Sequence, residues 1–290
     1  MKQHSSALLN LCLSMLIFGS IGLFVGQIPL PSSVIAMIRG FIGAPVVLAA
    51  MLLTGRIGEL KSLKAKLLPL VLSGTVMGLN WLLLFEAYKF TGVSVATVCY
   101  YMAPVFLVAA SPLLFKEKLG GKKLLCLAAA LLGMLLITLQ SNSRTGLRGV
   151  LLALTAALFY ATVISANKLM GEVSPYARTF LQLLTAALVL LPYNLLSGNM
   201  TSLNPGLGGG LCLLALGLIH TGFAYFLYFG AMDRLSAQTI GILSYIDPLS
   251  ALVFSALLLH ESLSATAALG ALLILGAAFI SEFPAHRKKS

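Results

Sequence analysis

Long apolar runs separated by short polar connections are the dominant pattern of this chain. Each run reaches the roughly 20 apolar residues that an α-helix needs to cross a membrane. The runs lack the alternation, and the length of about ten residues, that are typical of barrel strands. The pattern predicts an all-α membrane protein with ten transmembrane helices, at residues 7–26, 33–54, 67–89, 93–115, 121–139, 148–170, 174–197, 206–230, 236–259 and 264–283.

The first apolar run follows Lys2 and is similar to a secretory signal peptide. It is longer than the ~7–15 residues of a signal-peptide core. No A-x-A-like cleavage site follows it. We therefore expect this run to be retained as the first transmembrane helix.

The second half of the sequence repeats part of the first half. A shift of 144 residues aligns the two without a gap, so that Pro104 coincides with Pro248 and Glu117 with Glu261. Leucine matches are common in such an apolar chain, but the recurring spacing from a proline to a glutamate is more specific. The later part of each half is therefore predicted to share one structure.

The number of spans in each half determines how the two halves are related. Each half holds five spans, and because five is odd the second half enters the membrane from the opposite side. The sequence therefore predicts two five-helix inverted-topology repeats, at 1–145 and 146–290. This architecture is typical of secondary transporters, whose substrate sites lie near the membrane midplane between the repeats.

The composition agrees with a membrane protein. Of the 290 residues, 59% are hydrophobic and 9% are charged, and the mean hydropathy is +0.99. A soluble domain carries about 25% charged residues. The lipid bilayer is therefore the expected surroundings, and an ordinary soluble globular domain is excluded.

The net charge of +11 is distributed unevenly along the chain. If the N-terminus is cytoplasmic, 15 of the 19 lysine and arginine residues lie at the cytoplasmic ends of the spans. This asymmetry follows the positive-inside rule. It predicts a multi-pass plasma-membrane protein with both termini in the cytoplasm, and the basic excess does not indicate a nucleic-acid partner.

The sequence lacks the motifs of several other function classes. The four cysteines lie within apolar spans without a CxxC pair, so we interpret them as small buried apolar residues. No Walker, HExxH or GxSxG motif occurs. We expect no enzymatic activity, no catalytic residues, no metal site, no cofactor and no direct coupling to ATP.

Two matched prolines, Pro104 and Pro248, lie near the middle of their spans. Proline removes an intrahelical hydrogen bond and kinks a helix. We expect a kink at each position. The kinks serve packing alone, or they form a hinge or the wall of a cavity.

Small residues recur at helical spacing in the first two spans. Gly19, Gly22 and Gly26 lie three and four residues apart, and Gly40 and Gly43 lie on the next span. Such spacing is typical of helices that approach one another closely in membranes. We expect close helix contacts at these positions.

Asp247 lies near the centre of the ninth span, whereas the aligned residue of the first half is Ala103. A carboxylate at mid-membrane costs about 2.5–3.5 kcal/mol on insertion scales. Because one half does without it, the fold does not require this carboxylate. Asp247 is therefore a candidate proton carrier or cation anchor, or it caps the helix segment that Pro248 frees.

His220 is predicted to lie at about the depth of Asp247. A His220–Asp247 pair could hold a proton whose release depends on the substrate. The alternative is an interior histidine with its hydrogen bonds satisfied. A metal site would need more ligands than the sequence offers.

The remaining charged residues near the spans have simpler interpretations. Glu86 either pairs with Lys89 one helical turn away or forms a carboxylate of an outer vestibule. Arg39 is expected to snorkel or to pair with Glu86, and the alternative is binding of a substrate carboxylate. Glu117 and Glu261 match each other, so we expect structural roles, capping the next helix or pairing with nearby lysines.

Aromatic and amide side chains gather around the predicted kinks. Some of them lie near mid-depth, where a buried phenol needs a hydrogen-bond partner. Aromatic faces near a carboxylate suit a cation, and an amino acid with an aromatic side chain fits as well. The candidate substrate-binding residues, besides Glu86, His220 and Asp247, are Asn80, Trp81, Tyr100, Tyr101, Tyr225, Tyr228, Gln238 and Tyr245.

The chain resembles the drug/metabolite transporter superfamily and, more narrowly, EamA-type transporters. The resemblance covers the whole chain and is carried by the repeat and by the stretches NWLLLFEAYKFT (80–91), YYMAPVF (100–106), HTGFAYFLYFG (220–230) and SYIDPLS (244–250). It implies a ten-helix carrier of the bacterial inner membrane, usually an exporter of amino acids or other small metabolites. Taken with Asp247 and the aromatic residues, this leads us to expect a secondary exporter of an amino acid or an organic amine, with protons as a candidate coupling ion. The alternative is an importer or a multidrug-type carrier of choline-like cations. The sequence leaves the substrate, the direction of transport and the oligomeric state open.

Overall fold

The structure is a computed structural model that describes residues 2–91, 93–138, 146–171, 173–201, 203–258 and 265–282. Throughout these ranges the regular secondary structure is helical, and they contain no strand. The predicted all-α membrane protein is confirmed by the helices that this part of the chain forms.

Eight helices in the described ranges are long and apolar enough to cross a membrane, at Gln3–Val25, Ser32–Leu53, Leu67–Phe90, Val95–Phe115, Leu147–Leu169, Pro175–Leu196, Gly206–Met232 and Ala237–Leu258. They match the first four predicted spans and the sixth to ninth. The fifth and tenth predicted spans coincide with α7 (Gly121–Thr138) and α14 (Ala265–Glu282), which are not among these eight helices.

The elements follow one another with short connections. Before α7, the chain forms α1 (Lys2–Gly19), α2 (Ile21–Val25), α3 (Ser32–Leu53), the 3₁₀ helix η1 (Ile57–Lys66), α4 (Leu67–Phe90), α5 (Val93–Tyr100) and α6 (Ala103–Phe115). Between α7 and α14 it forms α8 (Leu147–Leu169), α9 (Pro175–Leu196), α10 (Gly206–Ala215), the π-helical segment η2 (Leu216–Phe223), α11 (Ala224–Met232), α12 (Ala237–Leu243) and α13 (Ile246–Leu258).

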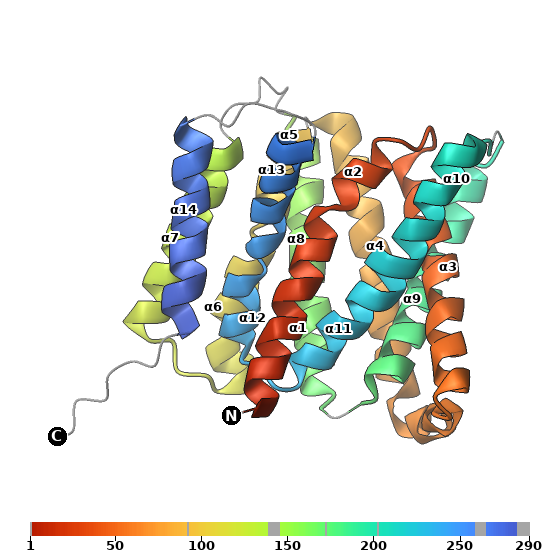
Figure 1. Cartoon of the computed structure of the whole chain (residues 1–290), viewed down its shortest axis with the longest axis horizontal. Helices are drawn as coiled ribbons and strands as arrows, with labels where there is room; N and C mark the ends of the chain where they lie inside the picture. The colour runs from red at the N-terminus through yellow and green to blue at the C-terminus, as the bar shows by residue number, and fades with distance from the viewer. Residues whose placement is uncertain are drawn as a thin grey trace.

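The helices stand side by side in one bundle (Figure 1). α4 packs against α8 and α9, α3 against α9 and η2, and α1 against α11 and α13, while α6 contacts α8 and α12. α7 and α14 pack along each other at one end of the bundle (Figure 1). α1 begins and α14 ends at the same edge, called the lower edge as drawn, and the opposite edge is the upper edge (Figure 1).

Both predicted proline kinks fall at helix interruptions. α5 ends at Tyr100 and α6 starts at Ala103, so Pro104 occupies the first turn of α6. α12 ends at Leu243, and α13 starts two residues before Pro248. An N–H group in the first turn of a helix has no intrahelical partner, so a proline is tolerated there. Each proline therefore lies in the first turn of a new helix and does not interrupt a continuous one.

Glu117 caps a helix of the other half. Its carboxylate accepts hydrogen bonds from the backbone N–H groups of Ala237 (2.8 Å) and Gln238 (3.3 Å), at the start of α12. It also lies 3.8 Å from the Lys168 ammonium. The expected structural role of Glu117 is therefore confirmed, but its predicted partners are wrong. Packing between the halves brings α12, in place of the next helix, to this carboxylate, and the ammonium group beside it is that of Lys168. Glu261 lies outside the described residues.

Close helix contacts occur at three of the five glycines singled out above. A Cβ on Gly19 would lie 2.6 Å from the Asp247 carbonyl oxygen, and Cβ atoms on Gly40 and Gly43 would touch Ala187 at 3.0 Å and the Thr221 methyl at 2.9 Å. A Cβ on Gly22 would meet no atom within 4 Å, and one on Gly26 only the Gly22 carbonyl oxygen, at 3.4 Å. Glycine spacing alone thus overpredicted the contacts on the first span.

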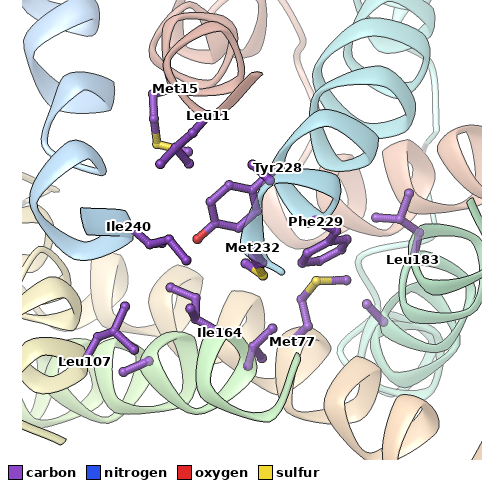
Figure 2. Packing of buried hydrophobic residues seen from close by; sticks show 14 of the residues in the cluster. Leu11, Met15, Met77, Leu107, Ile164, Leu183, Tyr228, Phe229, Met232 and Ile240 are labelled. Atoms are coloured by element: carbon purple, nitrogen blue, oxygen red, sulfur yellow. The ribbon is translucent and has the colours of Figure 1, made fainter. Parts of the chain in front are cut away.

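Apolar packing fills the lower half of the bundle. Figure 2 shows this cluster around Tyr228 and Phe229 of α11, with side chains from α1, α4, α6, α8, α9 and α12 directed toward them. Beneath it, the buried Arg178 guanidinium donates to Asp233 (3.1 Å), to the Gly171 carbonyl oxygen (2.9 Å) and to the Phe229 carbonyl oxygen (3.1 Å). The cluster and this network close the lower half.

Candidate functional site

A cavity of about 580 Å³ lies above the apolar cluster, enclosed by helices of both halves of the chain. It is bounded by the end of α1, by α2, by the first turns of α3 and by the second half of α4, which reach the upper half of the bundle (Figure 1). α5, α8, α11 and α13 complete the wall, together with Tyr101 and Ser244 at the two helix interruptions. Six of the predicted binding residues line the cavity: Trp81, Tyr100, Tyr101, Tyr225, Tyr228 and Asp247.

Asp247 enters the cavity at the start of α13, beside the interruption that precedes Pro248. Its Oδ2 accepts a hydrogen bond from the Tyr101 hydroxyl at 3.1 Å. Tyr245 supports this arrangement, because its hydroxyl donates to the Tyr101 carbonyl oxygen at 3.0 Å. The two helix interruptions thus meet, and a tyrosine from the first half holds the carboxylate of the second.

Arg39 lines the same cavity from α3. Its side chain is buried, at 8% exposure, and its guanidinium lies 4.5 Å from the centre of the Trp81 ring. Its Nε has no hydrogen-bond partner, and no carboxylate of the described residues comes within ion-pair distance. The expected pair with Glu86 is not formed, because Glu86 instead bonds Lys89 at 2.6 Å and the Tyr193 hydroxyl.

Aromatic rings form much of the remaining wall. Tyr100 stacks on Tyr160 with ring centres 5.6 Å apart, and the Tyr160 and Tyr228 hydroxyls are hydrogen-bonded at 2.9 Å. Tyr225 contacts the rings of Phe18 at 5.0 Å and Trp81 at 6.1 Å. Tyr228 belongs to this wall and to the apolar cluster below it (Figure 2), so it forms part of the floor of the cavity.

Two predicted residues lie behind the wall and support it. Asn80 accepts a hydrogen bond from the Tyr100 hydroxyl at 3.2 Å and donates to the Ala156 carbonyl oxygen at 2.5 Å, which positions the Tyr100 ring. Tyr245 acts through Tyr101 as described above. Neither side chain lines the cavity.

Three further predicted residues make contacts away from the cavity. Gln238 donates to the Ser111 hydroxyl at 3.1 Å and joins α12 to α6, while Glu86 is occupied by Lys89. His220, in η2, is hydrogen-bonded to the Ser20 hydroxyl at 2.9 Å and to the Ala215 carbonyl oxygen at 3.3 Å. His220 and Asp247 therefore have different partners and do not form a hydrogen-bonded pair in this structure.

Three aromatic wall residues, Phe18, Phe85 and Tyr88, were not singled out from the sequence, and Arg39 was expected to bind substrate only as the alternative interpretation. The spacing of Trp81, Phe85 and Tyr88 places them on one face of α4, so helical periodicity could have found two of them. Within the described residues, no group of three or more His, Cys, Asp or Glu side chains could hold a metal. The lining of the cavity therefore holds one carboxylate, Asp247, and one guanidinium, Arg39, among aromatic rings.

Comparison with known proteins assigns this architecture to a family. The sequence profile described as the EamA-like transporter family matches the chain twice, over residues 5–139 and 147–283. The chain belongs to the EamA-like transporter family. The two matches cover most of the chain of this EamA-like transporter, which agrees with the resemblance found from its motifs.

Two relatives of this EamA-like transporter illustrate the similarity. It is 32% identical over 257 residues to the uncharacterized transporter YxxF of Bacillus subtilis strain 168, covering 87% of this chain and 81% of the relative. It is also 26% identical to protein PecM of Dickeya dadantii strain 3937, over 69% of this chain and 68% of the relative. The family and the name of the Bacillus relative indicate a transporter.

A solved structure shares the fold of this EamA-like transporter. The structure, described as "Crystal structure of protein", superimposes with a TM-score of 0.84 at 23% sequence identity. The match covers 96% of this chain and 97% of the other. The arrangement of helices is therefore one that a solved protein also adopts.

Proposed function

We propose that this EamA-like transporter is a secondary carrier that exports a small metabolite, an amino acid or an organic amine, by alternating access. The observation that carries the proposal is the cavity between the two halves, with Asp247 in its wall and packed apolar residues below it. A carrier needs a site that is accessible from one side while the other side is closed. The upper cavity and the filled lower half meet that requirement.

The pairing of helices supports a ten-helix, inverted-repeat architecture. By their order in each half, α1 corresponds to α8, α3 to α9, α4 to the helix that contains η2 and α11, and α6 to α13. Exchanging each helix with its counterpart converts the α1–α11 contact into α4–α8, α1–α13 into α6–α8, and α3–η2 into α4–α9. The α3–α9 and α7–α14 contacts convert into themselves. This symmetry leads us to propose that α7 and α14 also span the membrane, as the fifth and tenth helices.

The distribution of charge supports an orientation in the plasma membrane. η1, at the lower edge (Figure 1), carries Lys61, Lys64 and Lys66, and most other lysines and arginines precede or follow helix ends at that edge. By the positive-inside rule the lower edge is cytoplasmic. The described state is then outward-facing, with both termini in the cytoplasm.

Asp247 provides a simple means of coupling transport to protons. One carboxylate can hold a proton or the ammonium group of a substrate, but not both at once. If the carrier changes between its outward-open and inward-open states only when this carboxylate holds a proton or a substrate, protons move inward as substrate moves outward. We assign this step to Asp247 ahead of His220, because His220 is engaged by Ser20 and does not line the cavity.

A carrier of choline-like or other organic cations is the second candidate function. The observation in its favour is the combination of one carboxylate with stacked aromatic rings, which suits a cation. Arg39 in the same wall acts against it, because its positive charge repels such a substrate. Import or export then depends on the gradients across the membrane.

Solute counterflow into proteoliposomes tests the proposal. Vesicles preloaded with a mixture of unlabelled amino acids and amines should accumulate a labelled component, and accumulation should saturate with its concentration. A channel would equilibrate the label without saturation or overshoot. Empty vesicles provide the background, and the absence of counterflow for every amino acid, amine and choline-like cation would contradict a carrier function.

A further inference from the structure

We infer that Arg39 and Asp247 form a two-point site that selects zwitterionic substrates, with a carboxylate held by Arg39 and an ammonium group by Asp247. The inference deepens the proposed transport function and depends on the same cavity. Arg39 is thereby a specificity-determining residue of a carrier that would otherwise accept simple amines.

The first argument is the state of Arg39 without a ligand. A buried guanidinium normally has a carboxylate or several carbonyl oxygens around it, because an unpaired buried charge is costly. Arg178 of this chain shows that normal arrangement, with Asp233 and two backbone carbonyl oxygens as partners. The Nε of both arginines lacks a hydrogen-bond partner, so the difference lies at the outer nitrogens. Those of Arg178 bond Asp233 and two carbonyl oxygens, whereas the guanidinium of Arg39, buried to 8% exposure, has the Trp81 ring as its neighbour. The site has the features of one completed by an anion.

The second argument is the depth and the orientation of the guanidinium. Arg39 is the eighth residue of α3, about 10 Å along the axis from the start of that helix. Its Cζ lies over the Trp81 ring, 4.5 Å from the ring centre. A guanidinium placed over an aromatic face still has its N–H groups to bind a carboxylate in a bidentate manner. Snorkelling toward the upper edge is not what the structure shows.

The third argument is the separation of the two charges within one cavity. Arg39 comes from the first half and Asp247 from the second, both line the same space, and they form no ion pair with each other. Asp247 accepts a hydrogen bond from Tyr101, and a carboxylate can accept several more. An α-amino acid presents the two complementary charges, and the aromatic wall suits an apolar side chain.

A substrate with only one charge leaves the other protein charge unsatisfied. A choline-like cation would place a second positive charge near Arg39, and a simple carboxylic acid would add a negative charge near Asp247. Discrimination of this kind comes from repulsion as much as from attraction. The pair of residues thus separates amino acids from amines and from acids of the same shape.

The test measures binding of two matched probe series to purified full-length protein by calorimetry. One series is phenylalanine, phenethylamine and 3-phenylpropionate, and the other is leucine, isoamylamine and 4-methylpentanoate. The variants are Arg39→Gln, Arg39→Lys and Asp247→Asn. Arg148→Gln is the matched control, because Arg148 also lies over an aromatic ring, Phe90 at 4.0 Å, but is exposed and outside the cavity.

We expect wild type and Arg148→Gln to bind the zwitterion of at least one series most tightly. Loss of the charge-assisted hydrogen bonds in Arg39→Gln should weaken zwitterion binding about 10- to 100-fold. Amine binding should become tighter, because the repulsion from Arg39 is removed. Arg39→Lys should keep part of the preference, and Asp247→Asn should lose discrimination against the acid. Thermal unfolding checks that every variant is folded.

Two results overturn the inference. One is a wild-type protein that binds none of the six probes or prefers the amine or the acid, and the other is an Arg39→Gln variant that retains the wild-type preference. Flux is measured separately on the same proteins in vesicles. Selective binding without flux would contradict the proposed carrier function and leave the zwitterion site standing, whereas flux with an unchanged preference in Arg39→Gln would do the opposite.

Discussion

The two interrupted helices, α5–α6 in the first half and α12–α13 in the second, share a backbone design but differ in chemistry. Each is broken just before a matched proline, and each carries a matched tyrosine, Tyr101 or Tyr245, at the break. Only the second places a carboxylate beside its proline, where the first has Ala103. The comparison shows that the break belongs to the scaffold and that Asp247 is an addition to it.

The matched tyrosines have also taken different partners. The Tyr101 hydroxyl donates to Asp247, whereas the Tyr245 hydroxyl donates to the Tyr101 backbone. One therefore holds the Asp247 carboxylate, for which we propose a role in transport, and the other holds the junction between the two breaks. The two tyrosines match in sequence, but their hydroxyl groups bond different partners.

Gly19→Ala should have the largest effect, because the end of α1 packs closely against the start of α13, just after the α12–α13 break, at this glycine. A Cβ there would lie 2.6 Å from the Asp247 carbonyl oxygen and 2.8 Å from the Ala251 nitrogen, and backbone atoms cannot move aside easily. We expect a loss of about 3 kcal/mol or more of stability. Thermal unfolding measures it. Gly22→Ala is the control and should behave as wild type, since nothing lies within 4 Å of its Cβ position. Equal stability of the two variants would contradict this packing.

Glu117→Ala should be next in size, because it removes the cap from the second broken helix. Loss of the two hydrogen bonds to the start of α12 is expected to cost about 1–2 kcal/mol. Unfolding temperature measures the effect, with the exposed Lys64→Ala as a control for loss of a charge at the same edge. A Glu117→Ala protein as stable as the control would show that α12 does not depend on this cap.

Tyr101→Phe and Tyr245→Phe should separate function from stability. Loss of the Tyr245 hydrogen bond is expected to lower stability by about 1 kcal/mol and to leave flux near wild type. Loss of the Tyr101 hydroxyl frees the carboxylate, so we expect flux to fall about tenfold, with less change in unfolding temperature. Flux and unfolding temperature are measured on both variants. Equal flux in Tyr101→Phe and Tyr245→Phe would contradict the functional distinction between the two breaks.

Pro104→Ala and Pro248→Ala should have the smallest effects and should resemble each other. Both prolines lie in the first turn of a helix, where their missing N–H groups are tolerated, so replacement mainly increases the freedom of the unfolded chain. We expect a loss of about 0.4–1 kcal/mol for each. Denaturation of the two variants side by side is the measurement, and a severe defect in only one would show that the breaks are not equivalent.

The sequence was sufficient for features that depend on local chemistry and on composition. Apolar run length predicted the all-helical membrane fold, and proline chemistry predicted where Pro104 and Pro248 would interrupt helices. The carboxylate of Asp247 stood out because the repeat has Ala103 at the aligned position. Six of the aromatic and acidic candidates line one cavity, and three of them, Tyr100, Tyr101 and Asp247, lie at the breaks.

The choice of partners was not predictable, because it depends on packing between distant segments. Glu117 reaches α12 across the boundary between the halves, and His220 reaches Ser20, 200 residues away. Arg39 was expected to find Glu86, but Lys89 and Tyr193 occupy that carboxylate. A sequence shows which charged side chains need partners, and the fold determines which residues those partners are.

The central claim, that the asymmetric carboxylate couples protons to substrate movement, is tested most directly by substrate flux in proteoliposomes under an imposed pH gradient. Wild-type protein should export substrate faster when the side that receives the substrate is acidic. Asp247→Asn should retain counterflow without a gradient and lose the response to pH. A variant that keeps the wild-type pH dependence would contradict the claim.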